Sequence, residues 1–297
     1  MKVVDILKTR NYKVVDAFTS KPLLGNPVAV ILDSEGLDTS AMQRIARWTN
    51  LSETTFVSPP TTKGADYKLR IFTPQSELPF AGHPTLGSAY AVIEAGLAKA
   101  NNGKLVQECE IGLVELAVKG EVGKEQISFA LPNAKLTQLQ PEDVDELEKI
   151  LGSSIERKYA PTIINVGAVW AVAKIPSVEI LLKLNPDFGR SKVFENRLGL
   201  TGLTIFAEYE AGDKFIEVRS FAPSCGVNED PVCGSGNGSV GVFMYQQGIV
   251  PSTGFSYQAT QGVRVGRDGQ IEVAITSSGA ISIGGNCVTC VSGQLTC

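Results

Sequence analysis

Arg70-Ile-Phe-Thr-Pro74 and Arg219-Ser-Phe-Ala-Pro223 are two copies of one short pattern, and this repeat decides the fold. Each copy is followed by a glycine-rich turn and then by an apolar stretch of helical length. The turns read Gly82-His-Pro-Thr-Leu-Gly-Ser88 and Gly234-Ser-Gly-Asn-Gly-Ser239. Because strand, turn and helix recur in the same order, the sequence predicts two homologous halves. We expect an α/β (α+β) fold in which each pseudo-symmetric half is a curved, mostly antiparallel sheet or barrel around a central helix.

The two halves are predicted to comprise residues 1–131 and 132–297, with the last strand free to return to the first half. Strands are expected where β-branched and aromatic residues cluster, and helices where apolar residues recur at helical spacing. The expected strands are residues 12–18, 27–32, 54–57, 67–72, 163–173, 201–207, 215–221, 263–265, 271–275 and 280–283. The expected helices are residues 40–48, 84–95, 141–151 and 239–247, the first of them capped by Thr39 or Ser40.

Composition narrows the class of protein. The 297 residues are 43% hydrophobic and 20% charged, with a formal net charge of −4 and no basic block. This argues against binding to nucleic acid or to an anionic membrane. Charges interrupt residues 1–10, so we expect no signal peptide there, and this stretch fits either an extra strand or a loose extension. No apolar run approaches the ~20 residues of a spanning helix, so we predict a soluble, cytoplasmic protein.

Metal binding is not expected. The six cysteines should be reduced thiols in a chain of this kind. Cys287-Val-Thr-Cys290 has the C-x-x-C form, but a zinc site needs about two more ligands. The chain has one histidine and no second C-x-x-C pair. Two thiols on a late strand and turn are therefore the favoured interpretation.

The repeated turns point to a binding site. The N-terminus of a helix presents unpaired N–H groups and a partial positive charge, and glycines let a ligand approach the backbone. Two homologous halves would naturally set two such helix ends facing each other across a cleft. We therefore expect a small carboxylate to be held between them, where negative charge developing in a transition state is also stabilised.

Three ionisable residues lie at or near these turns. His83 is the sole histidine; a capping or core role is the usual expectation, but its place in the repeated turn favours a site role. Glu53, at a change from helix to strand, is taken from its own stretch alone to be an exposed loop residue. Asp230, just ahead of the second helix, is either a turn residue or a site carboxyl. A carboxyl group in a partly apolar pocket has a raised pKa, which suits it to take and return a proton.

Cys233 directly precedes the second glycine turn and is a candidate catalytic thiol. A helix N-terminus lowers the pKa of a thiol, which would make this residue a reactive thiolate. The alternative is a small buried apolar residue, and the two interpretations carry equal weight.

Several ordered motifs resemble the PhzF-like family of phenazine biosynthesis, and the similarity runs from about residue 12 to the last strands. They are Asp16-Ala-Phe-Thr-Ser20, Gly25-Asn-Pro-Val-Ala-Val30, Asn50-Leu-Ser-Glu-Thr-Thr-Phe-Val57, Arg70-Ile-Phe-Thr-Pro74, Glu77-Leu-Pro-Phe-Ala-Gly-His-Pro84, and Glu229-Asp230 ahead of Gly234-Ser235.

The resemblance implies a diaminopimelate-epimerase-like fold of two similar domains, a homodimer, and an enzyme without metal or organic cofactor. It implies an isomerase that moves a proton between ring carbons of a dihydro-hydroxyanthranilate, although fold similarity does not transfer the substrate. By this resemblance Glu53 carries the proton, and His83 and Asp230 orient the substrate and assist. The amides around Gly82, Gly234 and Ser235 would hold the polar groups of the substrate.

Cys233 departs from the phenazine enzyme, which has no thiol at that position. In diaminopimelate epimerase and proline racemase, which share the fold, catalytic cysteines precede both glycine turns. This chain has Ala81 before the first turn, which disfavours a two-thiol racemase. Two alternatives to the isomerase stay open: a one-thiol epimerase that uses Cys233, and a binding protein that keeps the fold without the chemistry.

Overall fold

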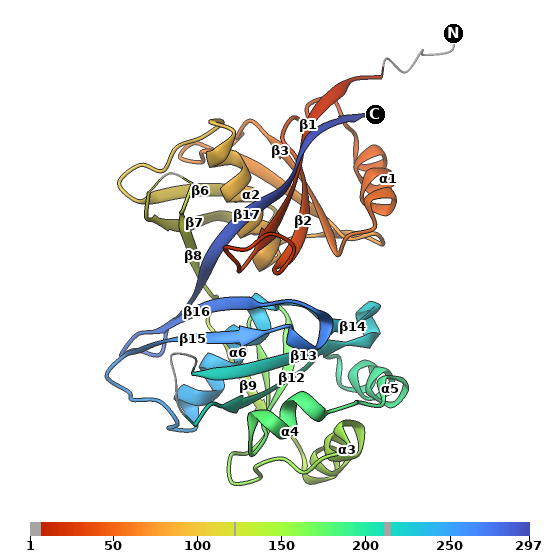
Figure 1. Cartoon of the computed structure of the whole chain (residues 1–297), viewed down its shortest axis with the longest axis vertical. Helices are drawn as coiled ribbons and strands as arrows, with labels where there is room; N and C mark the ends of the chain where they lie inside the picture. The colour runs from red at the N-terminus through yellow and green to blue at the C-terminus, as the bar shows by residue number, and fades with distance from the viewer. Residues whose placement is uncertain (1–6, 122, 211–214) are drawn as a thin grey trace. The chain divides into compact units, whose positions relative to one another are not determined.

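The computed structural model describes residues 7–121, 123–210 and 215–297, and it divides into two compact units (Figure 1). Unit 1 is the chain up to Phe129 together with Gly285–Cys297, and unit 2 is Ala130–Gly284. The chain passes between them twice. The first crossing lies within strand β8 (Gln126–Ala130), and the second lies within the long last strand β17 (Ile281–Thr296).

Unit 1 is a closed barrel around one helix. Its strands pair in the order β1-β2-β3-β4-β6-β7-β8-β17, and β17 pairs with β1 to close the ring. The pairs β2–β3 and β4–β6 are parallel. The elements are β1 (Thr9–Ala17), β2 (Asn26–Ile31), α1 (Thr39–Thr49), β3 (Glu53–Ser58), β4 (Tyr67–Phe72), β5 (Glu77–Leu78), α2 (Gly82–Glu94), β6 (Lys104–Cys109) and β7 (Gly112–Lys119).

Helix α2 is the core of unit 1. It packs on β1, β2, β3 and β4, and every residue from His83 to Val92 is buried. A helix that is apolar all round needs such an enclosure, because no face of it can be left to water. Gly87 permits the closest approach to the sheet, since a Cβ there would lie 2.4 Å from Cγ1 of Val28.

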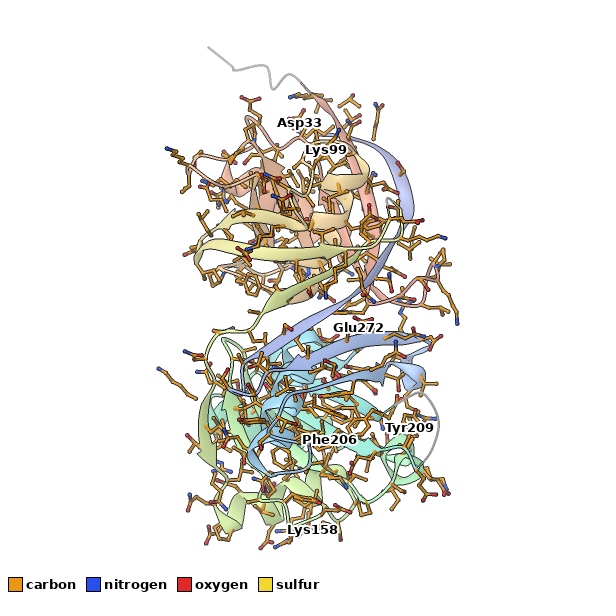
Figure 2. The ribbon with its side chains drawn as sticks, turned by 90° about the vertical axis from the view of Figure 1, so that its left-hand side faces the viewer. Asp33, Lys99, Lys158, Phe206, Tyr209 and Glu272 are labelled. Atoms are coloured by element: carbon orange, nitrogen blue, oxygen red, sulfur yellow. The ribbon has the colours of Figure 1, made fainter. Side chains whose placement is uncertain are left out.

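Unit 2 repeats this plan around helix α6 (Gly234–Gln246), which packs on β10, β11, β12 and β16. Phe206 of β12 lies in the interior (Figure 2) and meets Phe243 of α6 edge-on, with ring centroids 5.7 Å apart. The other elements are β9 (Lys135–Gln138), α3 (Pro141–Leu151), β10 (Thr162–Asn165), β11 (Val169–Lys174), α4 (Val178–Lys183), α5 (Phe188–Leu198), β12 (Gly202–Glu208), β13 (Ile216–Ala222), η1 (Pro223–Cys225), β14 (Val227–Asp230), β15 (Phe255–Gln261), η2 (Val263–Val265) and β16 (Gly269–Ile275).

The predicted repeat is visible in the strand pairing. In unit 1, β2–β3 is parallel, β3–β4 antiparallel and β4–β6 parallel, and β11–β12, β12–β13 and β13–β15 follow the same order in unit 2. The two repeated arginines also have the same partner type. Arg70 forms a bidentate pair with Glu77, and Arg219 forms one with Glu229. The predicted fold class, two pseudo-symmetric halves with a central helix each, is confirmed.

Several predicted elements differ in detail. The strand expected at 163–173 is two strands, β10 and β11, because the chain turns at Gly167 with φ 101°. The strand expected at 263–265 is the 3₁₀ turn η2, which lies between Gly262 (φ 104°) and Gly266 (φ 71°). The cap of α1 is Asp38, whose carboxylate accepts the N–H of Ala41, rather than Thr39 or Ser40.

The two central helices begin earlier than expected. Helix α2 begins at Gly82 and α6 at Gly234, so the glycine turns are themselves the first helical turns. Tertiary enclosure overrides the poor helix propensity of glycine here. Helices α4 and α5 were not anticipated. Of residues 1–10, Thr9 and Arg10 open strand β1, whereas residues 1–6 lie outside the described residues.

In the described ranges, none of the helices has the length and apolar character needed to cross a bilayer.

Candidate functional site

Glu53 and His83 meet inside unit 1. Glu53 is the first residue of β3, and His83 is the second residue of α2. Their Oε2 and Nε2 atoms lie 3.2 Å apart, and the two side chains are only 15% and 10% exposed. The sequence stretch around Glu53 alone had favoured an exposed loop residue, and this expectation is wrong because β3 begins at Glu53 and pairs with Val28.

The imidazole of His83 is held neutral. Burial lowers its pKa from 6.5 to about 3, against the opposing effect of a hydrogen bond to the backbone of Pro27. Proline has no N–H, so the ring is the donor in that bond and the carbonyl of Pro27 accepts. Because Nε2 faces Glu53, we assign the donated proton to Nδ1. Nε2 then presents a lone pair to the carboxyl group of Glu53.

The N-terminus of α2 has no side-chain cap. Ala81 is the cap residue, and its methyl group cannot accept the amide protons of the first turn. Gly82 opens the helix, and a Cβ there would lie 3.0 Å from Cζ of Phe129. The helix end thus keeps backbone donors of the kind that bind anions.

Asp230 and Cys233 lie together in unit 2. Asp230 ends β14, and its Oδ1 accepts the N–H of Val232 at 3.1 Å. Burial raises the pKa of Asp230 to about 6, opposed by the hydrogen bonds from Val232 and from the Cys233 thiol and aided by the charge of Glu229. The predicted raised carboxyl pKa is therefore found at Asp230.

Cys233 is the cap of α6, and its Sγ accepts the N–H of Gly236 at 3.3 Å. Its side chain is buried, and the residue is 5% exposed. Burial, followed by the charge of Asp230, raises the thiol pKa well above its ordinary value. The reactive-thiolate interpretation of Cys233 required a lowered pKa. Desolvation of the thiolate outweighs the favourable helix end, which agrees with the equally weighted alternative of a small buried residue.

Ser235 has a partner that the sequence did not reveal. The Nε1–H of Trp170 donates to Ser235 Oγ at 3.0 Å, and Cys233 Sγ lies 3.6 Å from the same oxygen. Trp170 belongs to β11 and is 2% exposed. Sequence reasoning missed Trp170 because it comes 65 positions before Ser235 and lies in no recognisable motif. The repeat gave no signal for it, because the pairing of β11 with β12 that brings Trp170 to the start of α6 appears only in the structure.

The predicted site residues thus form two clusters. Gly82, Glu53 and His83 belong to unit 1, and Asp230, Cys233, Gly234 and Ser235 belong to unit 2. Among the described residues, no group of three or more histidine, cysteine or acidic side chains is arranged to hold a metal ion. Cys287 and Cys290 both lie on β17 as free thiols, and burial raises the pKa of Cys287 to about 12.

The fold is shared with solved structures. A PhzF-family phenazine biosynthesis protein from Bacillus anthracis superposes with a TM-score of 0.87 at 24% identity, covering 97% of this chain and 99% of that one. A probable proline racemase from Agrobacterium radiobacter superposes with a TM-score of 0.67 at 13% identity, covering 96% and 92%. These likenesses show the epimerase-like fold of two related units.

The chain has this fold, and its curated relatives include named isomerases. Together these findings define the chain as an isomerase. Trans-2,3-dihydro-3-hydroxyanthranilate isomerase of Pseudomonas fluorescens is 37% identical over 258 residues, 86% of this chain and 87% of the relative. Antisense-enhancing sequence 1 of Schizosaccharomyces pombe is 43% identical over 293 residues, 96% and 98%. The chain belongs to the PhzF family, because residues 15–293 match the family described as phenazine biosynthesis-like protein.

Proposed function

We propose that the protein isomerises a small carboxylated substrate by moving one proton from carbon to carbon, with Glu53 as the group that carries it. The observation that carries the proposal is the buried pair of Glu53 and neutral His83, with Oε2 and Nε2 3.2 Å apart. The named hydroxyanthranilate isomerase among the relatives supports a substrate similar to trans-2,3-dihydro-3-hydroxyanthranilate.

The proposed proton transfer uses Glu53 as the group that takes and returns the proton, beside the neutral imidazole of His83. Glu53 as a carboxylate removes a proton from one carbon, the C–H electron pair moves into the adjacent π system, and the double bond shifts. Glu53 as an acid then returns the proton to another carbon of the same system, so no electrons are gained or lost. Nε2 of His83 can accept a hydrogen bond from the acid form. With a pKa of about 3, the imidazole does not keep the proton, which stays available to the product.

Asp230 and the second cluster are proposed to bind and assist. A carboxyl with a pKa of about 6 is present in both forms near neutral pH, so it can exchange a proton with a polar group of the substrate. The amides around Gly82, Gly234 and Ser235 are proposed to hold polar groups of the substrate. The homodimer and the cytoplasmic location implied by the family resemblance are part of this proposal, and sedimentation analysis tests the former.

Glu53→Gln is the deciding variant. It keeps the shape of the side chain but removes the group that takes the proton, so activity should fall on the order of 10²–10⁴-fold. The measurement is incubation with trans-2,3-dihydro-3-hydroxyanthranilate and a panel of small amino and hydroxy acids in deuterated water, read by NMR and mass spectrometry. Glu115→Gln is the matched control, because Glu115 is 61% exposed and pairs with Lys104. A fully active Glu53→Gln protein would overturn the assignment.

A one-thiol epimerase is the second candidate, favoured by the contact of Cys233 with Asp230 at the start of α6. In that case Cys233→Ser should abolish deuterium incorporation at a single stereocentre of an amino or hydroxy acid. Unchanged turnover in Cys233→Ser excludes it. A ligand that stabilises the protein but neither changes nor exchanges a proton would instead indicate a binding protein.

A further inference from the structure

Gln261, the last residue of β15, is bonded to both ends of the loop that carries Asp230 and Cys233. Its Oε1 accepts the backbone N–H of Cys233 at 3.1 Å, and its Nε2 donates to the carbonyl oxygen of Asp230 at 2.9 Å. Gln261 is 1% exposed. One buried side-chain amide therefore spans the whole loop from the end of β14 to the cap of α6.

Asn237 extends this network into the first turn of α6. Its Nδ2 donates to Gln261 Oε1 at 2.7 Å and to the carbonyl oxygen of Cys233 at 2.9 Å. Asn237 is fully buried. The strand end, the loop and the helix start are thus tied together by side-chain amides, which leaves the loop backbone few alternative positions.

The turn after β15 packs directly against the same loop. A Cβ at Gly262, where φ is +104°, would lie 2.4 Å from the carbonyl oxygen of Pro231. A Cβ at Gly269 would lie 2.4 Å from Cγ2 of Val232. Since β15 pairs with both β13 and β16, the frame that carries Gln261 is the interior of the sheet of unit 2.

We propose that Gln261 is a positioning residue of the isomerase, which fixes residues 230–233 so that the Asp230 carboxyl and the first amides of α6 meet the substrate in reactive geometry. The inference rests on the proposed role of Asp230. Displacement of a reacting group by about 1 Å is enough to lower a rate on the order of 10²-fold, so a loop that positions such a group needs a rigid support.

Gln261→Leu tests the proposal against a matched control on the same strand. Thr260→Val removes a buried hydroxyl that bonds to Glu217 and to the carbonyl of Ile216, neither of which belongs to the loop. We expect Gln261→Leu to lower kcat on the order of 10- to 100-fold with KM changed less than about threefold. Thr260→Val should keep kcat within about threefold at a similar loss of Tm. Equal kcat values for the two variants would overturn the proposal.

A double variant separates positioning from general damage. In an Asp230→Asn background, Gln261→Leu should reduce the remaining activity by less than about threefold, because the group it positions is already gone. Fully multiplicative losses would contradict the proposal. If Gln261→Leu does not fold, Gln261→Glu replaces it: this side chain keeps Oε1 but sets a carboxyl oxygen against the Asp230 carbonyl. Full activity of Gln261→Glu at pH 8 would equally contradict it.

Amide hydrogen exchange tests, without any substrate, whether Gln261 holds the loop of residues 230–233. Gln261→Leu should speed exchange at the amides of Cys233 and Asn237 while the centre of β13 stays protected. Unchanged exchange at both amides would show that Gln261 does not hold the loop. A wild-type protein inactive on every compound of the panel would reject the proposed function. The exchange experiment would still decide whether Gln261 holds residues 230–233 in place.

Discussion

Equivalent positions of the two units carry different chemistry. Glu53 begins β3 and is paired across the parallel ladder with Val28, whereas Gly202 begins β12 and is paired in the same way with Trp170. Unit 1 therefore has the carboxyl side chain of Glu53 where unit 2 has only the hydrogen atom of Gly202. The volume beside Gly202 is taken by the indole ring, because a Cβ there would lie 2.8 Å from Trp170 Cζ3.

The second position of each central helix shows the same divergence. His83 faces the carboxyl of Glu53, whereas Ser235 accepts a hydrogen bond from the indole of Trp170. Unit 1 thus holds a carboxyl group beside a neutral base, and unit 2 holds a hydroxyl fixed by a group that does not titrate. Under the proposed function, this difference supports proton transfer by Glu53 of unit 1, with unit 2 binding and assisting. Of the two equivalent helix starts, only the one in unit 1 has a carboxyl group beside a histidine.

Gly202→Ala should have the largest effect of the changes that probe this comparison. A Cβ at this position would lie 2.1 Å from the carbonyl oxygen of Phe221, and a backbone atom cannot move aside as a flexible side chain can. We expect a loss of about 3 kcal/mol in the free energy of unfolding, measured by urea denaturation. Gly293→Ala in β17, where a Cβ meets no atom within 4 Å of the described neighbours, is the control. Equal stability of the two variants would mean that unit 2 has room for a side chain where unit 1 has Glu53.

Trp170→Phe should have a smaller effect, on activity more than on stability. The change keeps an aromatic ring but removes the N–H that orients Ser235 Oγ, so kcat/KM should fall about tenfold, with the stability loss near 1 kcal/mol expected for one hydrogen bond. Trp48→Phe is the control, since Trp48 is 73% exposed on α1. If Trp170→Phe retains full kcat/KM, the Ser235 hydroxyl does not need the indole for activity. The Trp170–Ser235 pair would then match the Glu53–His83 pair in position but not in function.

The repeat in the sequence was sufficient to predict the two helices and the duplicated plan. It could not reveal the exchange of Glu53 for Gly202, because that equivalence depends on strand register and only appears once β3 and β12 are aligned by their pairing. The partners of His83 and Ser235 were hidden for the same reason. Pro27 and Trp170 lie far along the chain from them and are brought near only by the sheets.

Local sequence signals were not sufficient where burial decides the outcome. For Cys233 the helix N-terminus and desolvation act in opposite directions on the thiol pKa, and a sequence gives no measure of the second. Helices α4 and α5 did carry readable signals, since Ser177 and Asp187 cap them and Gly199 ends α5 in the left-handed conformation. Their weakly periodic apolar residues concealed them, and a search for caps would have found both.

The two clusters should also titrate with opposite effects on stability. His83 has a folded pKa of about 3, below its ordinary 6.5, so the unfolded chain binds more protons and stability falls as pH decreases from 6.5 toward 3. Asp230 has a folded pKa of about 6, above 3.8, so its contribution is complete below pH 3.8 and is lost as pH rises to 6. Between pH 4 and 6 the two slopes oppose each other, each at most about 1.4 kcal/mol per pH unit.

Each single variant should therefore uncover the slope of the other cluster. In His83→Gln, stability should fall from pH 4 to 6 relative to the wild type, because only the Asp230 contribution remains. In Asp230→Asn, it should rise over the same range, because only the His83 contribution remains. Urea midpoints at half-unit pH intervals provide the measurement, with each variant compared with the wild type so that other groups cancel. Parallel curves for the wild type and both variants would mean that neither His83 nor Asp230 is as strongly desolvated as its burial indicates. The two units would then differ only in the hydrogen bonds of their clusters.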